Sequence, residues 1–160
     1  MTLTHVCGAP RIRHIYISPG HNFRGHHGRE PSVHPVLELD EVECVAGKGL
    51  VGDRYFGYKE DYKGQVTFFD WLVYLELCRR LGVTDTPPSA LRRNIILEGL
   101  DLSALIGREF AIQDVKFFGM EECSPCYWMD RAIGPGAEEA LRSRGGLRAK
   151  VLTNGRLRRN

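Results

Sequence analysis

Turn-forming residues interrupt this chain so often that only short helices and strands fit between them. Glycine and proline gather at 18–20, 47–64, 86–89, 145–146 and 154–155, and residues of this kind end regular elements. The apolar runs between these points are mostly short and strand-like, which leaves room for only two or three short helices. The sequence therefore predicts a mainly β (α+β) protein, built as a barrel or a sandwich rather than a doubly wound sheet.

Several strands can be predicted individually. Residues 12–17, 65–69 and 94–98 are rich in strand-forming residues, and 37–45 alternates apolar with acidic residues as a half-exposed, bulged strand does. Asn154-Gly155 is a strong hairpin signal. It predicts that the strand ending at Leu152 turns back to pair with the residues from Arg156 onward.

One helix has clear boundaries. Asp70 is suited to cap its first turn and Gly82 to end it. Its apolar residues recur at helical spacing, which predicts one buried face. The members of that face are Trp71, Leu72, Leu75, Cys78 and Leu81.

Length and composition limit the class of protein. The 160 residues fit one domain, spanning 1–160, with a core that needs no disulfide. Five cysteines, an odd number, and the lack of a signal-peptide pattern favour a cytoplasmic protein. The longest apolar stretch is too short to cross a membrane. A net charge of +2 is too mild to predict a nucleic-acid partner.

Basic residues are concentrated near the end of the chain. They form either a solvated basic surface or a wall that faces an anion. These residues are Arg142, Arg144, Arg148, Lys150, Arg156, Arg158 and Arg159.

The glycine pattern of residues 47–52 matches the dinucleotide-binding motif G-x-G-x-x-G. That motif must open a helix, and the residues from Asp53 to Gly57 do not form an amphipathic one, so we predict no dinucleotide site. The loop still brings Asp53 and Arg54 together. Arg54 can act as a forked phosphate ligand or simply pair with Asp53, and the spacing alone favours the pair.

Arg92, Arg93 and Asn94 open a predicted apolar strand. Because neighbouring strand residues point to opposite faces, Arg92 and Asn94 are expected on one side and Arg93 on the other. A guanidinium beside an amide suits a phosphate or the edge of a pterin-like heterocycle. A surface salt bridge explains the same residues equally well.

Histidines gather in the predicted loop at 18–35. They are candidate ligands for a metal, with Cys123 and Cys126 able to complete a site, although histidine-rich loops are more often simply solvated. The four histidines are His21, His26, His27 and His34.

The Cys123-Ser124-Pro125-Cys126 segment has four interpretations. It can be a redox pair, half of a zinc site, two buried structural cysteines, or a reactive thiolate. No second cysteine pair follows, and the flanking strand-helix-strand pattern of redox proteins is missing. A reactive Cys126 needs nearby cations, and three arginines follow closely in sequence: Arg131, Arg142 and Arg144.

A set of segments in fixed order resembles the MOSC domain family, named after the C-terminal domain of molybdenum cofactor sulfurases, and in particular its stand-alone bacterial members. The resemblance covers about 36–157. It rests on Gly49-Leu50-Val51-Gly52-Asp53-Arg54-Tyr55, Gln65-Val66-Thr67, the run from Arg92 to Leu102, Gly107-Arg108, Cys123-Ser124-Pro125-Cys126 and Gly145-Gly146-Leu147-Arg148.

This resemblance implies a closed, mixed β-barrel that binds molybdenum cofactor, a pterin dithiolene that carries a phosphate and holds molybdenum. Cys126 corresponds to the cysteine that ligates the metal in one group of relatives and is proposed to carry persulfide sulfur in another. Cys123 would assist it as a second catalytic thiol. The implied cofactor-binding residues are Asp53, Arg54, Thr67, Arg92 and Asn94.

The resemblance implies either reduction of N-hydroxylated small molecules or transfer of sulfur, with a reductase or a sulfur-donor protein as partner. The N-terminal β-barrel domain of the larger relatives is missing from this sequence, and the chain ends without their usual Gly-Asp. Two other classes stay open: a metal-dependent enzyme that uses the histidine loop without a pterin, and a non-catalytic anion-binding module.

Overall fold

The computed structural model describes residues 9–20 and 34–160, which form ten strands, three α-helices and two 3-10 helices. The strands are β1 (Arg11–Ile17), β2 (Leu37–Leu39), β3 (Glu41–Val45), β4 (Gly49–Leu50), β5 (Val66–Asp70), β6 (Ile95–Glu98), β7 (Glu109–Ile112), β8 (Val115–Glu122), β9 (Leu147–Val151) and β10 (Gly155–Arg158). The helices are α1 (Trp71–Leu81), η1 (Pro88–Leu91), η2 (Ser103–Leu105), α2 (Trp128–Ala132) and α3 (Ala137–Ala140).

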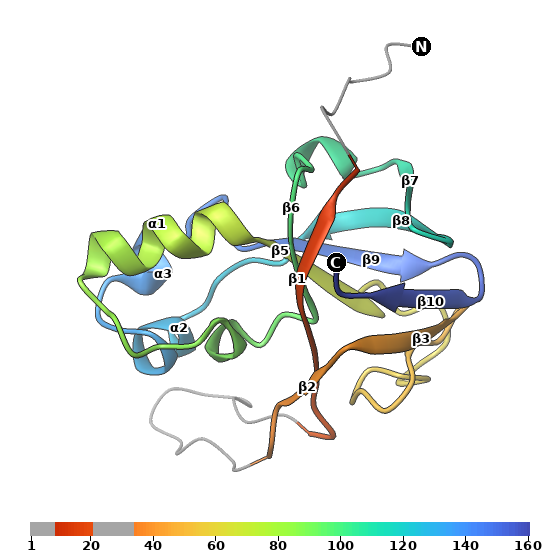
Figure 1. The fold of residues 1–160 in the computed structure, drawn as a ribbon, viewed down its shortest axis with the longest axis horizontal. Helices are drawn as coiled ribbons and strands as arrows, with labels where there is room; N and C mark the ends of the chain where they lie inside the picture. Colours follow the sequence, from red (N-terminus) through yellow and green to blue (C-terminus); the bar gives the residue numbers. More distant parts are fainter. Residues whose placement is uncertain (1–8, 21–33) are drawn as a thin grey trace.

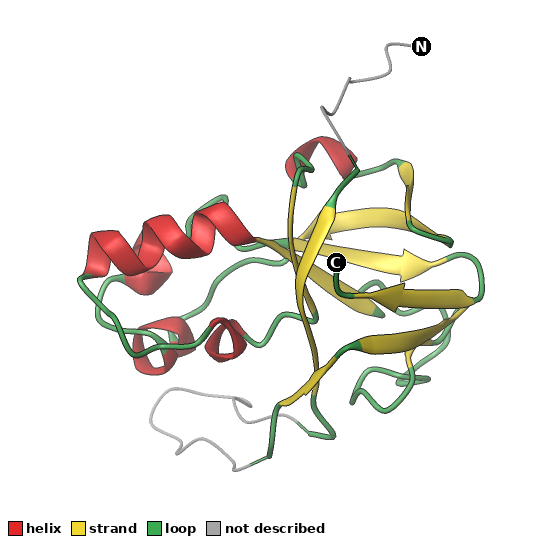
Figure 2. Ribbon diagram, viewed as in Figure 1, coloured by secondary structure: helices red, strands yellow, loops and turns green. Residues whose placement is uncertain are grey.

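The strands form two sheets. Seven of them pair in the order β2-β1-β6-β5-β9-β8-β7, and the other three in the order β10-β3-β4 (Figure 1). Helices α1, α2, α3 and η1 gather at one side of the strands (Figure 2). None of the helices within these residues has the length and apolar character needed to cross a membrane.

The predicted closed β-barrel is wrong. Within the described residues, the edge strands β2 and β7 do not pair, so neither sheet closes and the fold is mixed α+β. The chain bends at Asp40 between β2 and β3. Because of that bend, β3 leaves the large sheet and pairs with β10 and β4 instead.

The predicted hairpin at Asn154-Gly155 is also wrong. Strand β9 already pairs with β5 on one edge and β8 on the other, so no edge is left for β10. The side chain of Asn154 accepts a hydrogen bond from the amide of Ala46 at 2.8 Å. This contact directs β10 onto β3, in the second sheet.

Helix α1 begins and ends where the sequence predicts. The Asp70 carboxylate accepts a hydrogen bond from the Leu72 amide at 2.8 Å, and Gly82 adopts the left-handed conformation that ends the helix. The predicted buried face is only partly correct. Tyr74 and Leu77 face the core, whereas Leu72 and Leu75 are 60% and 45% exposed.

Two apolar cores lie on opposite faces of the large sheet. One fills the space between the two sheets, and the other lies under α1, α2 and α3. Strand β5 separates them, since Phe68 enters the first core and Phe69 the second. Side chains alternate along a strand, so Thr67 lies on the same face as Phe69, toward the helices.

Candidate functional site

A cavity of about 210 Å³ opens on the helical face of the large sheet. It contains five of the predicted site residues: Arg54, Thr67, Arg92, Cys123 and Cys126. The remaining wall is formed by Tyr55, Tyr62, Gly64, Ala90, Leu91, Arg93, Ser124, Trp128, Met129, Ala132 and Arg148. These segments are far apart in sequence, and the fold brings them together.

Asp53 lies behind the cavity wall rather than in it. Its buried carboxylate accepts hydrogen bonds from the Ser18 amide at 3.0 Å and the Tyr55 amide at 3.3 Å. It also accepts one from Nη1 of Arg54 at 3.3 Å. Arg54 was expected either to bind a phosphate or to pair with Asp53. In the structure it pairs with Asp53, which orients it, and it also lines the cavity.

Arg54 and Arg92 line the cavity, and each carries one unsatisfied donor. Arg54 Nε and Arg92 Nη1 are buried, and neither finds a hydrogen-bond partner in the described part of the chain. The Nη2 atom of Arg92 is held by the Ser18 hydroxyl at 3.0 Å and the Gly20 carbonyl at 2.6 Å. A buried guanidinium N–H without an acceptor is costly, and two positively charged arginines on the cavity wall suit an anionic ligand.

The electrostatics of Arg92 support the same conclusion. Burial, and then the positive charge of Arg54, lower the pKa of Arg92 to about 10. The guanidinium therefore stays protonated at neutral pH. A bound anion would relieve the repulsion between the two cations.

The expected alternation of Arg92, Arg93 and Asn94 does not occur, because Arg92 adopts the left-handed conformation that ends η1 and β6 begins only at Ile95. Both arginines consequently line the cavity. Arg93 is buried and donates to three carbonyls: those of Leu91 at 3.0 Å, Cys123 at 3.0 Å and Gly145 at 2.9 Å. It ties the cysteine segment to the rest of the fold.

Asn94 and Thr67 are engaged with each other. The Asn94 carbonyl oxygen accepts from the Thr67 amide at 3.0 Å and the Thr67 hydroxyl at 3.1 Å, and its amide nitrogen donates to the Tyr16 carbonyl at 3.0 Å. Asn94 is absent from the cavity wall, whereas Thr67 forms part of it. The pair holds β5 and β6 in register beneath the cavity.

The two cysteines differ in exposure. Cys123 is 6% exposed and follows β8, where its amide donates to the Gly146 carbonyl at 2.8 Å. Cys126 is exposed, and its carbonyl accepts from the Met129 amide at 2.9 Å in the turn that leads into α2. Both side chains line the same cavity.

Arg148, which belongs to the basic cluster that the sequence offers as an anion-facing wall, lines the cavity. Burial opposes its charge, but the adjacent Cys123 thiol, to which it is hydrogen-bonded, raises the pKa of Arg148. Its Nη1 also lies 3.3 Å from a carboxylate oxygen of Glu121. The pairing of Arg148 with Thr67 across β9 and β5 places it over the cavity.

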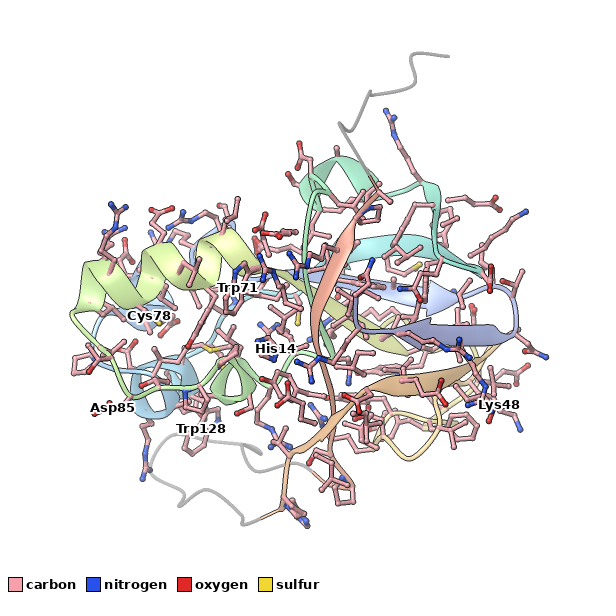
Figure 3. The ribbon with its side chains drawn as sticks, viewed as in Figure 1. His14, Lys48, Trp71, Cys78, Asp85 and Trp128 are labelled. Atoms are coloured by element: carbon pink, nitrogen blue, oxygen red, sulfur yellow. The ribbon has the colours of Figure 1, made fainter. Side chains whose placement is uncertain are left out.

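Tyr55 and Tyr62 were missed as site residues. Their rings stack with centroids 5.3 Å apart, and the guanidinium of Arg54 lies 4.7 Å from the centre of Tyr55. Trp128, labelled on α2 in Figure 3, adds a further aromatic side chain to the wall. Aromatic residues scattered along a sequence carry no local signal for such an arrangement.

The basic C-terminal residues do not form one anion-facing wall. Most of them pair with carboxylates at the surface, and Arg148 alone among them lines the cavity. The pairs are Arg142–Glu139, Arg144–Glu76, Arg148–Glu121, Lys150–Asp61, Arg156–Glu41, Arg158–Glu41, and Arg159 with Glu38 and Asp40. The cations around the cysteines are therefore Arg54, Arg92, Arg93 and Arg148, rather than the expected Arg131, Arg142 and Arg144.

The predicted histidine site falls mainly on His21, His26 and His27, which lie outside the described residues. His34 is described and exposed. Within 9–20 and 34–160, no three histidine, cysteine, aspartate or glutamate side chains gather as a metal would require.

Because Cys126 is exposed and Cys44 is buried, we expect alkylating agents to modify the two thiols at very different rates. Burial, with a smaller contribution from Glu43, raises the pKa of the Cys44 thiol to about 12, so at pH 8 almost none of it is thiolate. We expect iodoacetamide to modify Cys126 at least about 100-fold faster than Cys44 in the folded protein. Peptide mapping by mass spectrometry measures both rates. In urea, where both thiols are exposed, the two rates should become similar. If Cys44 and Cys126 already reacted at equal rates in the folded protein, the burial of Cys44 would be contradicted.

The fold is similar to that of proteins with solved structures. The crystal structure of the YuaD protein from Bacillus subtilis superposes with a TM-score of 0.71 at 17% identity, covering 94% of this chain and 91% of that one. The structure of YiiM from Escherichia coli superposes with a TM-score of 0.59 at 18% identity, covering 92% and 65%. At such identities the likeness concerns the fold alone.

The sequence comparison is more specific. No curated protein matches the chain in sequence. The model of the MOSC domain family, however, matches residues 52–160, which include every predicted cofactor-binding residue and both cysteines of the cavity. The resemblance inferred from the ordered segments is thereby confirmed, and the chain belongs to the MOSC domain family.

Proposed function

We propose that this protein binds molybdenum cofactor in the cavity and uses Cys126 as the thiolate ligand of the metal. The observation that carries this proposal is a pair of arginines, Arg54 and Arg92, each with one buried, unpartnered donor, that line the same cavity as an exposed thiol. Membership of the MOSC family supports it, because the family is associated with this cofactor.

The chemistry of the cavity fits the parts of that cofactor. Arg54 and Arg92 would hold its phosphate, since guanidinium groups bind phosphate oxygens through charged hydrogen bonds. Tyr55, Tyr62 and Trp128 provide aromatic surface for a planar heterocycle. The Cys126 thiolate would bind molybdenum, because soft sulfur ligands suit such a metal.

The protein's own residues would orient the group and control its surroundings. Asp53 fixes Arg54, and Arg93 fixes the backbone that carries the cysteines. When bound, the cofactor supplies the electron-transfer or sulfur-transfer chemistry, while the protein supplies the thiolate and the binding geometry. The substrate would be a small molecule, and the partner a reductase or a sulfur donor.

The test is the cofactor content of protein produced in a host that makes molybdenum cofactor. We expect molybdenum and pterin near one per chain, measured by elemental analysis and by pterin fluorescence after release. Cys126→Ser should lose molybdenum, and Arg92→Met should lower affinity for the pterin by about tenfold or more, because it removes a charged hydrogen bond.

Arg142→Met is the matched control, since Arg142 is an exposed arginine that pairs with Glu139 away from the cavity. It should bind like the unmodified protein. Equal pterin content in Arg92→Met and Arg142→Met would refute the assignment of the anion site. If the purified protein contained zinc or iron but no pterin, the proposed cofactor would be refuted. A metal site that uses the histidines would then be favoured.

A further inference from the structure

Ser18, at the end of β1, lies opposite Arg92 of the cavity wall. Strand β1 runs antiparallel to β6 with Ile15 paired to Ile95, and continuing this register brings Ser18 to Arg92 (Figure 1). Ser18 is 2% exposed and does not itself line the cavity. It also lies outside residues 52–160, which the family model matches, so the match implies nothing about its role.

The Ser18 side chain holds the guanidinium of Arg92. Its hydroxyl accepts a hydrogen bond from Arg92 Nη2 at 3.0 Å, and the Gly20 carbonyl accepts one from the same nitrogen at 2.6 Å. Both hydrogens of Nη2 are thereby used. Nη1 is buried and finds no acceptor among the described residues. The bend from Ser18 to Gly20 thus fixes one nitrogen of Arg92 and leaves another without a partner.

The Ser18 hydroxyl is itself held in place. It has one proton to donate, and two carbonyls lie within reach, that of Pro35 at 2.8 Å and that of Gly20 at 3.0 Å. Because Gly20 already accepts from Arg92, the closer carbonyl of Pro35 is the better acceptor. A hydroxyl that donates to Pro35 presents its lone pairs to Arg92. Alanine at this position would supply no such acceptor.

The backbone of Ser18 holds Arg54, the second arginine. The Ser18 carbonyl accepts from the Arg54 amide at 2.8 Å, and the Ser18 amide donates to Asp53 Oδ1 at 3.0 Å. The same carboxylate oxygen lies 3.3 Å from Arg54 Nη1. Ser18 therefore contacts the backbone of Arg54 directly and its side chain through Asp53.

These contacts oppose a repulsion. Burial, and then the positive charge of Arg54, disfavour the charged form of Arg92. The backbone of Arg92 is also left-handed, with a φ of 53°, which is unfavourable for a residue with a side chain. Such an arrangement persists only where surrounding contacts hold it. Contacts made before a ligand arrives also reduce the entropy that binding costs.

We propose that Ser18 is a positioning residue of the anion site: its hydroxyl holds the Arg92 guanidinium, and its backbone holds Arg54, in the arrangement that binds the phosphate group of a ligand. This inference rests on the proposed function, because it takes Arg54 and Arg92 as the residues that hold the phosphate. It adds to that site a residue outside the matched part of the chain. Ser18 acts through the two arginines and does not touch the ligand.

The test uses inorganic phosphate as the probe and the full chain without its cofactor. Titration followed by NMR chemical shifts at pH 8, where Arg92 is protonated, measures dissociation constants even when binding is weak. We expect Ser18→Ala to weaken phosphate binding by about tenfold, because Arg92 Nη2 loses one of its two acceptors. Ser18→Thr keeps a hydroxyl and should recover part of the affinity.

A double-mutant cycle separates positioning from a general loss of structure. If Ser18 acts through Arg92, Ser18→Ala should change phosphate affinity by less than about twofold in a protein that already carries Arg92→Met. A structural role predicts about the same tenfold loss with and without Arg92→Met. That outcome would overturn the positioning role of the hydroxyl.

Ser103→Ala is the matched control, because Ser103 is an exposed serine outside the cavity whose hydroxyl donates to Asp101 at 2.8 Å. It should bind phosphate like the unmodified protein. Equal phosphate affinity in Ser18→Ala and Ser103→Ala would show that the Ser18 hydroxyl positions nothing.

Pterin content, measured separately, distinguishes this inference from the proposed function. A chain that binds pterin and phosphate regardless of Ser18→Ala refutes the positioning role alone. A chain without saturable phosphate binding refutes both the positioning role and the assignment of Arg54 and Arg92 as the anion site.

Discussion

Replacing Arg93 with methionine should lower the free energy of unfolding by about 3 kcal/mol and move the cysteine segment. Methionine fills similar space but donates no hydrogen bond, so the carbonyls of Leu91, Cys123 and Gly145 would lose the donors that Arg93 supplies. Buried carbonyls without partners, and the loss of bonds from a charged donor, each cost about 1–3 kcal/mol. For a chain of this length the melting temperature should fall by roughly 6–12 °C.

The consequence for the site should be visible independently of stability. Freed from Arg93, the backbone at Cys123 would move, and the alkylation rate of this buried thiol should rise in the folded protein. Arg142→Met is the control for removal of a positive charge, because the Arg142 side chain is 75% exposed. Arg142→Met should change the free energy of unfolding by no more than about 0.5 kcal/mol. If the two variants unfold at the same denaturant concentration, the anchoring role of Arg93 is wrong.

Gly145→Ala should be as damaging, for a steric reason. The added Cβ would lie 2.2 Å from the Cys123 carbonyl oxygen and 2.9 Å from Pro125 N, distances that real structures do not tolerate. Both neighbours are backbone atoms, so rotation of a side chain cannot relieve the collision. We expect a loss of about 3 kcal/mol or more in the free energy of unfolding, measured in urea. The proposed pterin binding should be lost as well, because the cavity wall must shift.

Gly134→Ala provides the matched control. At that position the nearest neighbour of an added Cβ is Val83 Cγ1 at 3.4 Å, an ordinary contact. Its stability should change by no more than about 1 kcal/mol. A Gly145→Ala protein with unchanged stability and pterin content would show that the cysteine segment can move freely, contrary to the packing described.

Local signals predicted local structure well. Asp70 and Gly82 marked the ends of α1 because a cap depends only on residues within one turn. The absence of a helix after the glycine motif was correct too, since residues 51–64 form turns.

Signals that depend on distant partners failed. The barrel was expected from the family resemblance and the number of strands, but closure depends on whether β2 meets β7, and no local pattern encodes that pairing. Asn154-Gly155 suits a hairpin turn, and on local signals alone it predicts one. The occupied edges of β9 and the contact with Ala46 decided otherwise.

The site was predicted unevenly for the same reason. Arg54, Arg92, Cys123 and Cys126 were recognised because they lie in short motifs, and all four line one cavity. The role of each side chain depends on hydrogen bonds between distant segments. The alternation of side chains along a predicted strand therefore could not reveal that Arg93 anchors the cysteine segment. Arg148 faces the cavity only through the register of β9 against β5.

The separation of the cavity segments has a consequence for how the protein acquires a ligand. Arg54, Arg92, Cys126 and Arg148 come together only after strands distant in sequence have paired, and contacts of this kind close late in folding because their loops are long. A chain in which these strands have not yet paired therefore lacks the complete set of cationic side chains. An anionic ligand that needs both Arg54 and Arg92 binds the folded chain and shifts the folding equilibrium by mass action, by about 2.7 kcal/mol at a hundred times its dissociation constant.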